Sequence, residues 1–144
     1  MKRRFKIGNR WIGEGEPTYF IAEVGSNFDN SLNITKELVD AAKESRAEAI
    51  KFQSFLADKI VSKETFKGLK LSFQAKWEKP VYQVYKEAEF PRNWHKEIAD
   101  YAKKQGITFF SAPYDFEAVD LLAEINVPAF KIGSGDITWL EIVE

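Results

Sequence analysis

Four short runs of mainly apolar residues recur along the chain, at residues 19–24, 49–53, 107–112 and 129–134. Apolar runs of this length that alternate with helical patterns are typical of parallel strands covered on both faces. Each run also contains a polar or ionisable residue, which is costly to bury unless it is paired or faces a ligand. Because parallel α/β folds place their chemistry at the carboxyl ends of the strands, these polar positions are the first candidates for a functional site.

Helical patterns separate the runs. The first helix is predicted to start at Asn30 or Ser31, either of which suits an N-cap, and to face the sheet with one apolar stripe. That stripe consists of Ile34, Leu38, Ala41 and Ala42. Further helices are predicted from Asn93 to a stop at Gly106, and from Asp115 onwards. The pattern is therefore one of strands and helices in alternation.

Two segments are less regular. Residues 54–90 are too long for an ordinary strand-to-helix connection, and we expect one or two short helices there, above all at 81–89. We expect the aromatic residues of this segment to pack rather than to bind ligand, and they are Phe66, Phe73, Trp77, Tyr82 and Tyr85. Residues 136–144 follow the fourth run and are predicted to begin another helix.

The amino end predicts a β-hairpin, with 5–7 and 10–12 as strands around a Gly8–Asn9 turn. The predicted organisation is a hairpin over residues 1–17 and four βα units over 18–144. Such alternation indicates an α/β fold with a parallel sheet. Four units form either an open doubly wound sheet or half of a (β/α)8 barrel, which normally needs about 250 residues. The half-barrel would leave unpaired strand edges.

Composition narrows the choice of partners. The chain has 144 residues, 44% of them hydrophobic and 30% charged, with a formal net charge of -1. This near-balance gives no electrostatic reason to expect nucleic acid or an anionic membrane as partner. No apolar run approaches the ~20 residues that span a bilayer, and no signal peptide is visible, so a cytoplasmic location is the default expectation.

Thiolate and histidine chemistry find few candidates. The absence of cysteine excludes disulfides, thiolate catalysis and cysteine-ligated metals from these residues. The one histidine, His95, falls within a helical pattern, and we interpret it as an ordinary residue on a helix surface. Any histidine-ligated metal would therefore draw most of its ligands from outside this chain.

Two lysines interrupt apolar strand patterns. Lys51 and Lys131 would form a compact site for phosphate or carboxylate if both pointed to the same end of the sheet. Alternatively, each neutralises a buried acid such as Glu23 or Asp136. The glycine-flanked Ser134, which leads from a strand into a helix, favours the anion site because such turns offer N–H groups and a hydroxyl to phosphate.

Glu23 lies next to the last residue of the first run and precedes a tight turn that contains Asn27. A carboxylate there can act as a general acid or base, or can stabilise developing positive charge. A salt bridge to Lys51 is the structural alternative, and both roles are compatible. Asn27 is a candidate ligand contact, although asparagine also suits turns for conformational reasons.

These motifs together resemble the sialic acid synthase family, the N-acetylneuraminate synthases and their legionaminate, pseudaminate and spore-coat-polysaccharide relatives. The matching stretches, in order, are 21–27 (IAEVGSN), 37–42, 47–53 (AEAIKFQ), 110–115 (FSAPYD) and 127–136 (VPAFKIGSGD). Their order and spacing over almost the whole chain make the resemblance far more specific than any one motif.

The resemblance implies the amino-terminal half of a (β/α)8 TIM barrel preceded by a capping hairpin. It implies condensation of phosphoenolpyruvate with an N-acetylated sugar such as N-acetylmannosamine, giving a nine-carbon 2-keto sugar acid and phosphate. The full-length family also implies a divalent metal, Mn or Mg, with histidine ligands from later strands. It further implies a homodimer in which a C-terminal antifreeze-like domain caps the partner's site.

Residue by residue, the resemblance assigns catalytic roles to Glu23 and Asp136. It assigns phosphoenolpyruvate or substrate contacts to Lys51, Gln53, Ser111, Lys131, Ser134 and Asn27. The chain departs from the family at Phe28, where histidine is usual, at Ala112, where threonine is common, and at Arg46, where glycine is frequent.

Three hypotheses therefore remain. The favoured one is the phosphoenolpyruvate half-site of a sialic-acid-type synthase, incomplete for activity by itself. The second is another phosphoenolpyruvate-condensing synthase, such as one that makes a deoxy-octulosonate or deoxy-heptulosonate. The third is a non-catalytic module that binds a phosphorylated ligand or a partner through its open sheet edges.

Overall fold

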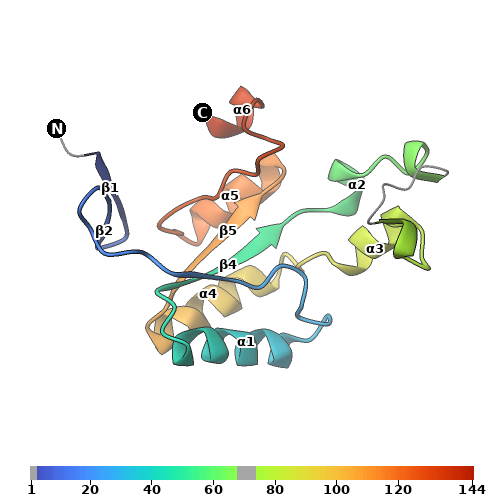
Figure 1. Ribbon diagram of the computed structural model, residues 1–144. Helices are drawn as coiled ribbons and strands as arrows, with labels where there is room; N and C mark the ends of the chain where they lie inside the picture. The colour runs from blue at the N-terminus through green and yellow to red at the C-terminus, as the bar shows by residue number, and fades with distance from the viewer. Residues whose placement is uncertain (1–2, 68–73) are drawn as a thin grey trace.

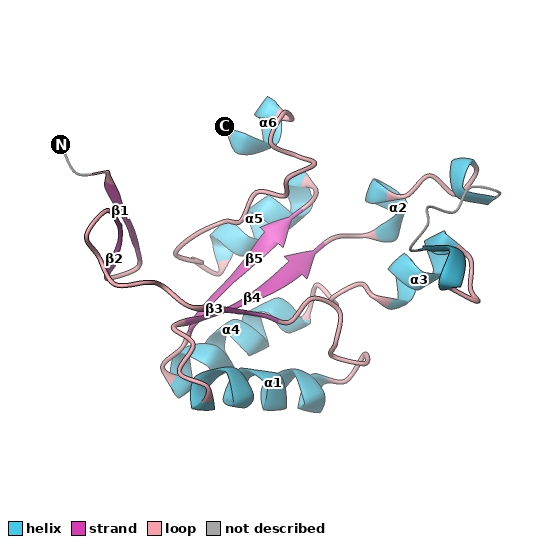
Figure 2. Cartoon of the chain, viewed as in Figure 1, coloured by secondary structure: helices cyan, strands magenta, loops and turns pink. Residues whose placement is uncertain are grey.

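A three-stranded parallel sheet, in the order β3-β4-β5, is the centre of the molecule (Figures 1 and 2). The computed structural model describes residues 3–67 and 74–144. The three strands are β3 (Ile21–Glu23), β4 (Ala49–Ser54) and β5 (Thr108–Pro113). The first three predicted strands are thus confirmed, and their carboxyl ends lie at one edge of the sheet.

Three longer helices connect and follow these strands: α1 (Leu32–Glu44), α4 (Trp94–Gln105) and α5 (Phe116–Glu124). Ser31 caps α1 by accepting a hydrogen bond from the Ile34 amide, and Asp115 caps α5 in the same way through the Ala118 amide. Gly106 ends α4 with a φ of 69°, which favours glycine. The predicted helix boundaries are confirmed at these positions.

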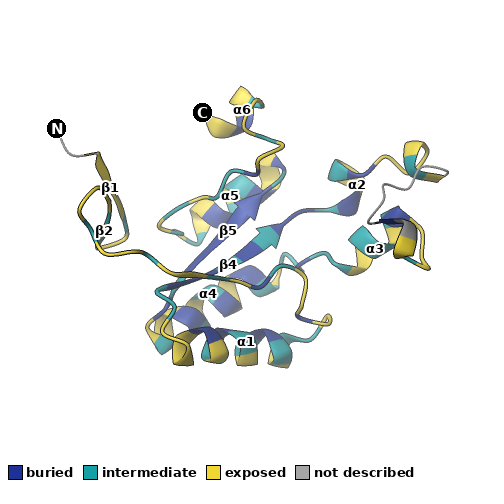
Figure 3. Ribbon diagram, in the orientation of Figure 1, coloured by how far each residue is buried: buried dark blue, intermediate teal, exposed yellow. Residues whose placement is uncertain are grey.

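The three helices share one hydrophobic core with the sheet, and β4 and β5 are its most continuously buried part (Figure 3). The core joins β4 and β5 to all three helices through Val39, Ala42, Ile50, Phe52, Ile98, Ala102, Phe109 and Leu122. The sequence predicted helices on both faces of the sheet. The described helices cover only the face that carries Ile50 and Phe52, and the opposite face, which carries Lys51 and Gln53, is called the open face below. The apolar stripe of α1 is also rotated, with Thr35, Val39 and Ala42 buried and Ala41 exposed.

The fourth predicted strand is reduced to a single parallel bridge between Ser111 and Phe130. The Lys131 amide donates to the Ser111 carbonyl oxygen at 3.1 Å. Residues 129–132 have β5 on one side, and no strand of the described residues pairs with them on the other side. Hydrogen bonds from β5 alone are therefore available to form a strand at 129–132. The helix predicted at 136–144 is likewise short, since α6 covers only Leu140–Val143.

The predicted hairpin is confirmed as an antiparallel pair, β1 (Arg4–Ile7) and β2 (Arg10–Gly13). Gly8 forms its turn with a φ of 57°. An ion pair of 2.8 Å joins Arg10 to Glu48, immediately before β4. The hairpin therefore lies toward the amino-terminal ends of the strands, away from the edge that carries the polar residues (Figure 1).

The long segment between β4 and α4 contains the short helices α2 (Ala57–Ile60) and α3 (Val81–Glu87) and two 3₁₀ turns, at Thr65–Lys67 and Gln74–Lys76. Short helices were predicted here and are confirmed. Tyr85 packs edge-on against Phe55 and Trp77, whereas Phe73 lies outside the described residues. Among the helices of the described residues, none has both the length and the apolar character needed to cross a membrane.

Candidate functional site at the carboxyl ends of the strands

Glu23 and Lys51 form an ion pair between neighbouring strands. The two residues are direct partners in the β3–β4 register, which places their side chains on the same face of the sheet. The Glu23 carboxylate also accepts a hydrogen bond of 3.1 Å from the Gly25 amide. The Lys51 side chain is 12% exposed and that of Glu23 is 46% exposed, so the cation is the more deeply held partner.

Lys131 brings a second positive charge close to Lys51. Burial, and then the charge of Lys131, lower the pKa of Lys51. The two ammonium groups repel each other, and the burial of Lys51 removes much of the water that would screen this repulsion. A doubly charged anion at this point would relieve that repulsion.

A cavity of about 570 Å³ opens beside Lys131. Four predicted site residues line it, namely Gln53, Lys131, Ser134 and Asp136. Glu23 and Lys51 do not line the cavity. Lys51 is connected to it by its electrostatic interaction with Lys131, which does line the cavity. The structure therefore brings together the predicted cations and acids of three segments that are distant in sequence.

Asp136 lies at one wall of the cavity. Its Oδ2 atom is buried and has no hydrogen-bond partner among the described residues. The carboxylate folds over Gly133, where a Cβ atom would collide with Oδ2 and would lie 3.3 Å from the Tyr114 ring. Glycine at position 133 thus permits both side chains to reach the cavity, and an unpaired buried carboxylate oxygen of this kind favours a ligand donor.

Two predicted contact residues lie elsewhere. Ser111 is the register partner of Phe52 and shares its helix-covered face, where it is fully buried. Asn27 donates a hydrogen bond of 2.9 Å to the Val24 carbonyl oxygen and holds the turn after β3. The structure therefore gives both residues structural bonds and does not join them to the cavity.

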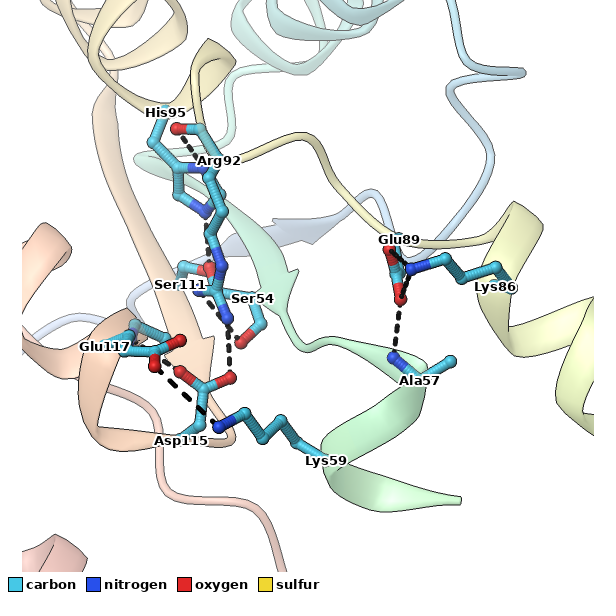
Figure 4. Close-up of polar contacts among 11 residues, drawn as sticks. Ser54, Ala57, Lys59, Lys86, Glu89, Arg92, His95, Ser111, Asp115 and Glu117 are labelled. Atoms are coloured by element: carbon cyan, nitrogen blue, oxygen red, sulfur yellow. Dashed lines mark hydrogen bonds and ion pairs between the residues drawn. The ribbon is translucent and has the colours of Figure 1, made fainter. Parts of the chain in front are cut away.

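Ser111 instead belongs to a buried hydrogen-bond chain with Ser54 and His95 (Figure 4). The Ser54 hydroxyl lies 2.6 Å from both the Ser111 hydroxyl and His95 Nε2. His95 Nδ1 faces the carbonyl oxygens of Pro91 and Arg92, which accept but do not donate. Nδ1 must therefore carry the proton, so Ser54 donates to Nε2 and accepts from Ser111.

His95 is thus a correction to the sequence analysis, which placed it on a helix surface. It is completely buried, and burial lowers its pKa to about 4, with weaker contributions from its neighbours. The imidazole is accordingly neutral near pH 7, in agreement with its hydrogen bonds. The sequence around His95 does not reveal its hydrogen-bond partner, because Ser54 lies 41 positions earlier in the chain.

Sequence reasoning also missed two polar contacts of the long segment after β4, made by Arg92 and Glu89. Arg92 donates to Asp115 Oδ2 at 2.6 Å, and the Asp115 side chain is 7% exposed (Figure 4). In a separate contact, Glu89 accepts a 2.6 Å hydrogen bond from the Ala57 amide and pairs with Lys86. These bonds fasten the long segment after β4, which supplies part of the cavity wall, to the ends of β4 and β5.

The residues present do not fit the divalent metal that the resemblance implies. In residues 3–67 and 74–144, no group of three or more His, Cys, Asp or Glu side chains is arranged to hold a metal ion. Both ring nitrogens of His95 are engaged in hydrogen bonds. That the ligands lie outside this chain stays a prediction.

Fold and cluster together define the class of parallel β–α proteins whose binding sites lie at the carboxyl ends of the strands. The profile of the NeuB family matches residues 38–144. An uncharacterized protein of Methanocaldococcus jannaschii is 41% identical over 98% of this chain and 38% of its own length. The N,N'-diacetyllegionaminic acid synthase of Campylobacter jejuni is 40% identical over 85% of this chain and 37% of its own length. The chain belongs to the NeuB family.

Solved structures agree with this assignment. The N-acetylneuraminic acid synthetase of Leptospira borgpetersenii superposes with a TM-score of 0.81 at 28% identity, over 99% of this chain and 45% of the other. The spore coat polysaccharide biosynthesis protein of Bacillus subtilis gives 0.75 at 31% identity, over 98% and 36%. The chain thus has the fold of the amino-terminal part of the NeuB barrel, and it spans 36% to 45% of the length of these two relatives.

Proposed function

We propose that this chain carries the phosphoenolpyruvate half-site of a synthase of the sialic acid type. The reaction condenses phosphoenolpyruvate with an N-acetylated amino sugar such as N-acetylmannosamine to a nine-carbon 2-keto sugar acid and phosphate. The observation that carries the proposal is the pair of lysines, Lys51 and Lys131, held close together beside a cavity in a NeuB family chain. Two cations suit a substrate with both a phosphate and a carboxylate.

Gln53 and Ser134 complete this anion site in the proposal. Both line the cavity with Lys131 and offer neutral hydrogen-bond donors to phosphate oxygens. Gln53 is on the same face of β4 as Lys51, two residues further on, because side chains alternate along a strand. Phosphoenolpyruvate would supply negative charge between the two ammonium groups, in competition with Glu23 at Lys51.

Glu23 and Asp136 are the catalytic carboxylates in the proposal, and the chemistry points first to Glu23. The enol carbon C3 of phosphoenolpyruvate attacks the sugar aldehyde, and positive charge develops at C2. Water adds at C2, and the proton that it releases passes to the alkoxide formed from the aldehyde. The C2–O bond to phosphate then breaks, and the C2 hydroxyl gives its proton to the departing phosphate to leave the ketone. Phosphate competes with Glu23 for Lys51, so substrate binding turns the Glu23 carboxylate toward the charge at C2 and the proton of the attacking water.

The remaining parts of the proposal lie beyond these residues. The divalent metal, the homodimer and the acceptor-capping domain are expected from the longer family members, of which this chain covers about 38% in the curated relatives. Experiments on activity accordingly use the whole natural polypeptide that carries this sequence.

Product analysis tests the proposed reaction. The protein is incubated with phosphoenolpyruvate and, in parallel, six-, five- and four-carbon sugars, and the products are identified by mass spectrometry. Since phosphoenolpyruvate adds three carbons, we expect a nine-carbon acid from N-acetylmannosamine together with an equal amount of phosphate. An eight- or seven-carbon acid would instead identify another sugar-acid synthase, and no phosphate release with any acceptor would contradict the proposal.

A further inference from the structure

The lining of the cavity contains residues of two kinds. Gln53, Lys131 and Ser134 belong to the proposed anion site, and Lys59 is a further lining cation, which pairs with Glu117. The aromatic residues of the lining, called the aromatic side below, are Phe55, Tyr85, Tyr114 and Trp139, and Tyr114 lies beside Asp136 at Gly133. The aromatic side carries no positive charge for phosphoenolpyruvate, so it can take another part of the substrates.

Tyr114 is held in place from both sides of its ring. It follows β5 directly, and its amide donates to the Ser54 carbonyl oxygen at 3.2 Å. Phe55 meets the ring edge-on, with centroids 6.1 Å apart and planes at 87°. On another side the ring lies against Gly133, where a Cβ atom would be 3.3 Å away. The place of the phenol is therefore set by backbone and packing, as a specificity residue requires.

Asp136 and Tyr114 form a complementary acceptor and donor. The Asp136 Oδ2 atom is buried and finds no partner in the described part of the chain. Burial, and then the charges of Asp136 and Tyr85, raise the pKa of Tyr114, so the phenol keeps its proton. No hydrogen bond joins the Tyr114 hydroxyl to any residue in 3–67 or 74–144. A donor and an acceptor are thus both available to a ligand.

The chemistry of this side suits a neutral polyol and not phosphoenolpyruvate. Phosphoenolpyruvate has no hydroxyl group to donate at neutral pH, and its negative charges are repelled by a carboxylate. A sugar hydroxyl both donates and accepts, and the C–H faces of a sugar ring pack on aromatic side chains. The unpaired carboxylate oxygen would be satisfied by such a hydroxyl.

We propose that Tyr114 is a specificity-determining residue for the acceptor, with its hydroxyl and the Asp136 carboxylate binding hydroxyl groups of the sugar. The inference rests on the proposed function, and it assigns the sugar to the aromatic side of the cavity. Among the residues predicted from sequence only Asp136 pointed to this side, because Tyr114 lies within a motif but carries no charge.

Steady-state kinetics of Tyr114→Phe test the inference. Removal of the hydroxyl is expected to raise the KM for N-acetylmannosamine about tenfold, and to leave the KM for phosphoenolpyruvate within about twofold. Tyr101→Phe is the matched control, since the Tyr101 hydroxyl donates to Asp40 between α4 and α1, outside the cavity. That control is expected to change neither KM.

The outcomes separate the inference from the proposed function. If the wild-type protein makes the sugar acid and Tyr114→Phe leaves the sugar KM unchanged, or raises the phosphoenolpyruvate KM instead, the role of Tyr114 is overturned. If the wild-type protein makes no sugar acid from any acceptor, the proposed function fails and the inference fails with it. With a series of monodeoxy sugars, one analogue is expected to bind the wild type and Tyr114→Phe equally, and equal discrimination by both proteins against every analogue would overturn the inference.

Discussion

Successive residues of β4 lie on opposite faces of the sheet, and the two faces differ in how far their buried polar groups find partners within the protein. On the helix-covered face, Ser54 is fully buried and hydrogen-bonded to both His95 and Ser111. On the open face, Lys51 is largely buried beside a second ammonium group, that of Lys131. The first face satisfies each of these side chains within the protein. On the second face Glu23 pairs with Lys51, but the two ammonium groups still repel each other, and the buried Asp136 oxygen has no donor among the described residues.

The difference separates structural polarity from functional polarity. A buried network whose members are all paired fixes the packing of strands and helices. Two like charges close together raise the free energy of the unliganded protein, and so does a buried carboxylate oxygen without a donor, such as that of Asp136. A ligand that pairs with these groups removes this cost. The two faces should therefore respond to substitution in different assays, stability for one and binding or turnover for the other.

The largest effect is expected on turnover, from Glu23→Gln on the open face. Loss of the carboxylate should lower kcat by roughly 100-fold or more, because it removes general acid–base and electrostatic help from the transition state. The free energy of unfolding should change less than turnover, since the amide oxygen that replaces the carboxylate still accepts a hydrogen bond from the 12% exposed Lys51. Glu97→Gln, which breaks an ion pair between outer helices, is the control and should keep full activity. Normal turnover of Glu23→Gln would remove this residue from the mechanism.

On the helix-covered face, His95 should make stability depend on pH. Its pKa is about 4 in the folded chain, below the ordinary value of 6.5, so the unfolded state binds the proton more tightly. The contribution is fully present above the unfolded pKa and is lost as pH falls toward 4, in total about 3 kcal/mol. Urea unfolding of the wild type and His95→Gln between about pH 7 and pH 4 measures it. Parallel pH profiles for the two proteins would contradict this account.

Ser54→Ala should cost about 2 kcal/mol of stability, because it leaves His95 Nε2 without a donor and the Ser111 hydroxyl without an acceptor. Urea denaturation monitored by tryptophan fluorescence checks the value. Ser45→Ala removes an exposed hydroxyl at the end of α1 and should change stability far less. Equal effects of the two substitutions would show that the buried chain does not stabilise the fold.

The smallest effect on stability is expected at Gln53, the neighbour of Ser54 on the open face. Gln53→Ala should alter the free energy of unfolding by no more than about 0.5 kcal/mol. It should raise the KM for phosphoenolpyruvate about fivefold through one lost hydrogen bond. A large loss of stability at Gln53, as at Ser54, would erase the distinction between the two faces.

Much of this architecture could be predicted from sequence, because apolar runs and caps are local signals. The run at 49–53 and the capping residues Ser31 and Asp115 each lie within a few residues of the element that they define. The fourth strand was predicted wrongly from the apolar residues at 129–132. A continuous strand there depends on a second neighbouring strand, on the side away from β5, and not only on its own residues. Strand formation there is a tertiary property.

The site was predicted in part for the same reason. Lys51 and Lys131 stand out because a charge within an apolar run is costly wherever the strand lies. The face on which Ser111 lies depends on its register with Phe52, which no local pattern reveals. The Arg92–Asp115 pair likewise joins residues that are 23 positions apart, in surroundings that look like ordinary loop and helix start.

Calorimetric titration of phosphoenolpyruvate tests the central claim most directly, that the open face of the sheet holds its two lysines for an anionic ligand. The whole polypeptide is compared with its Lys51→Met and Lys131→Met variants, and with Lys43→Met, whose ammonium group binds the Gly106 carbonyl oxygen on the outer side. We predict that each site variant binds about 30-fold more weakly than the wild type, and that the Lys43 variant binds normally. Equal affinity in all four proteins would contradict the account.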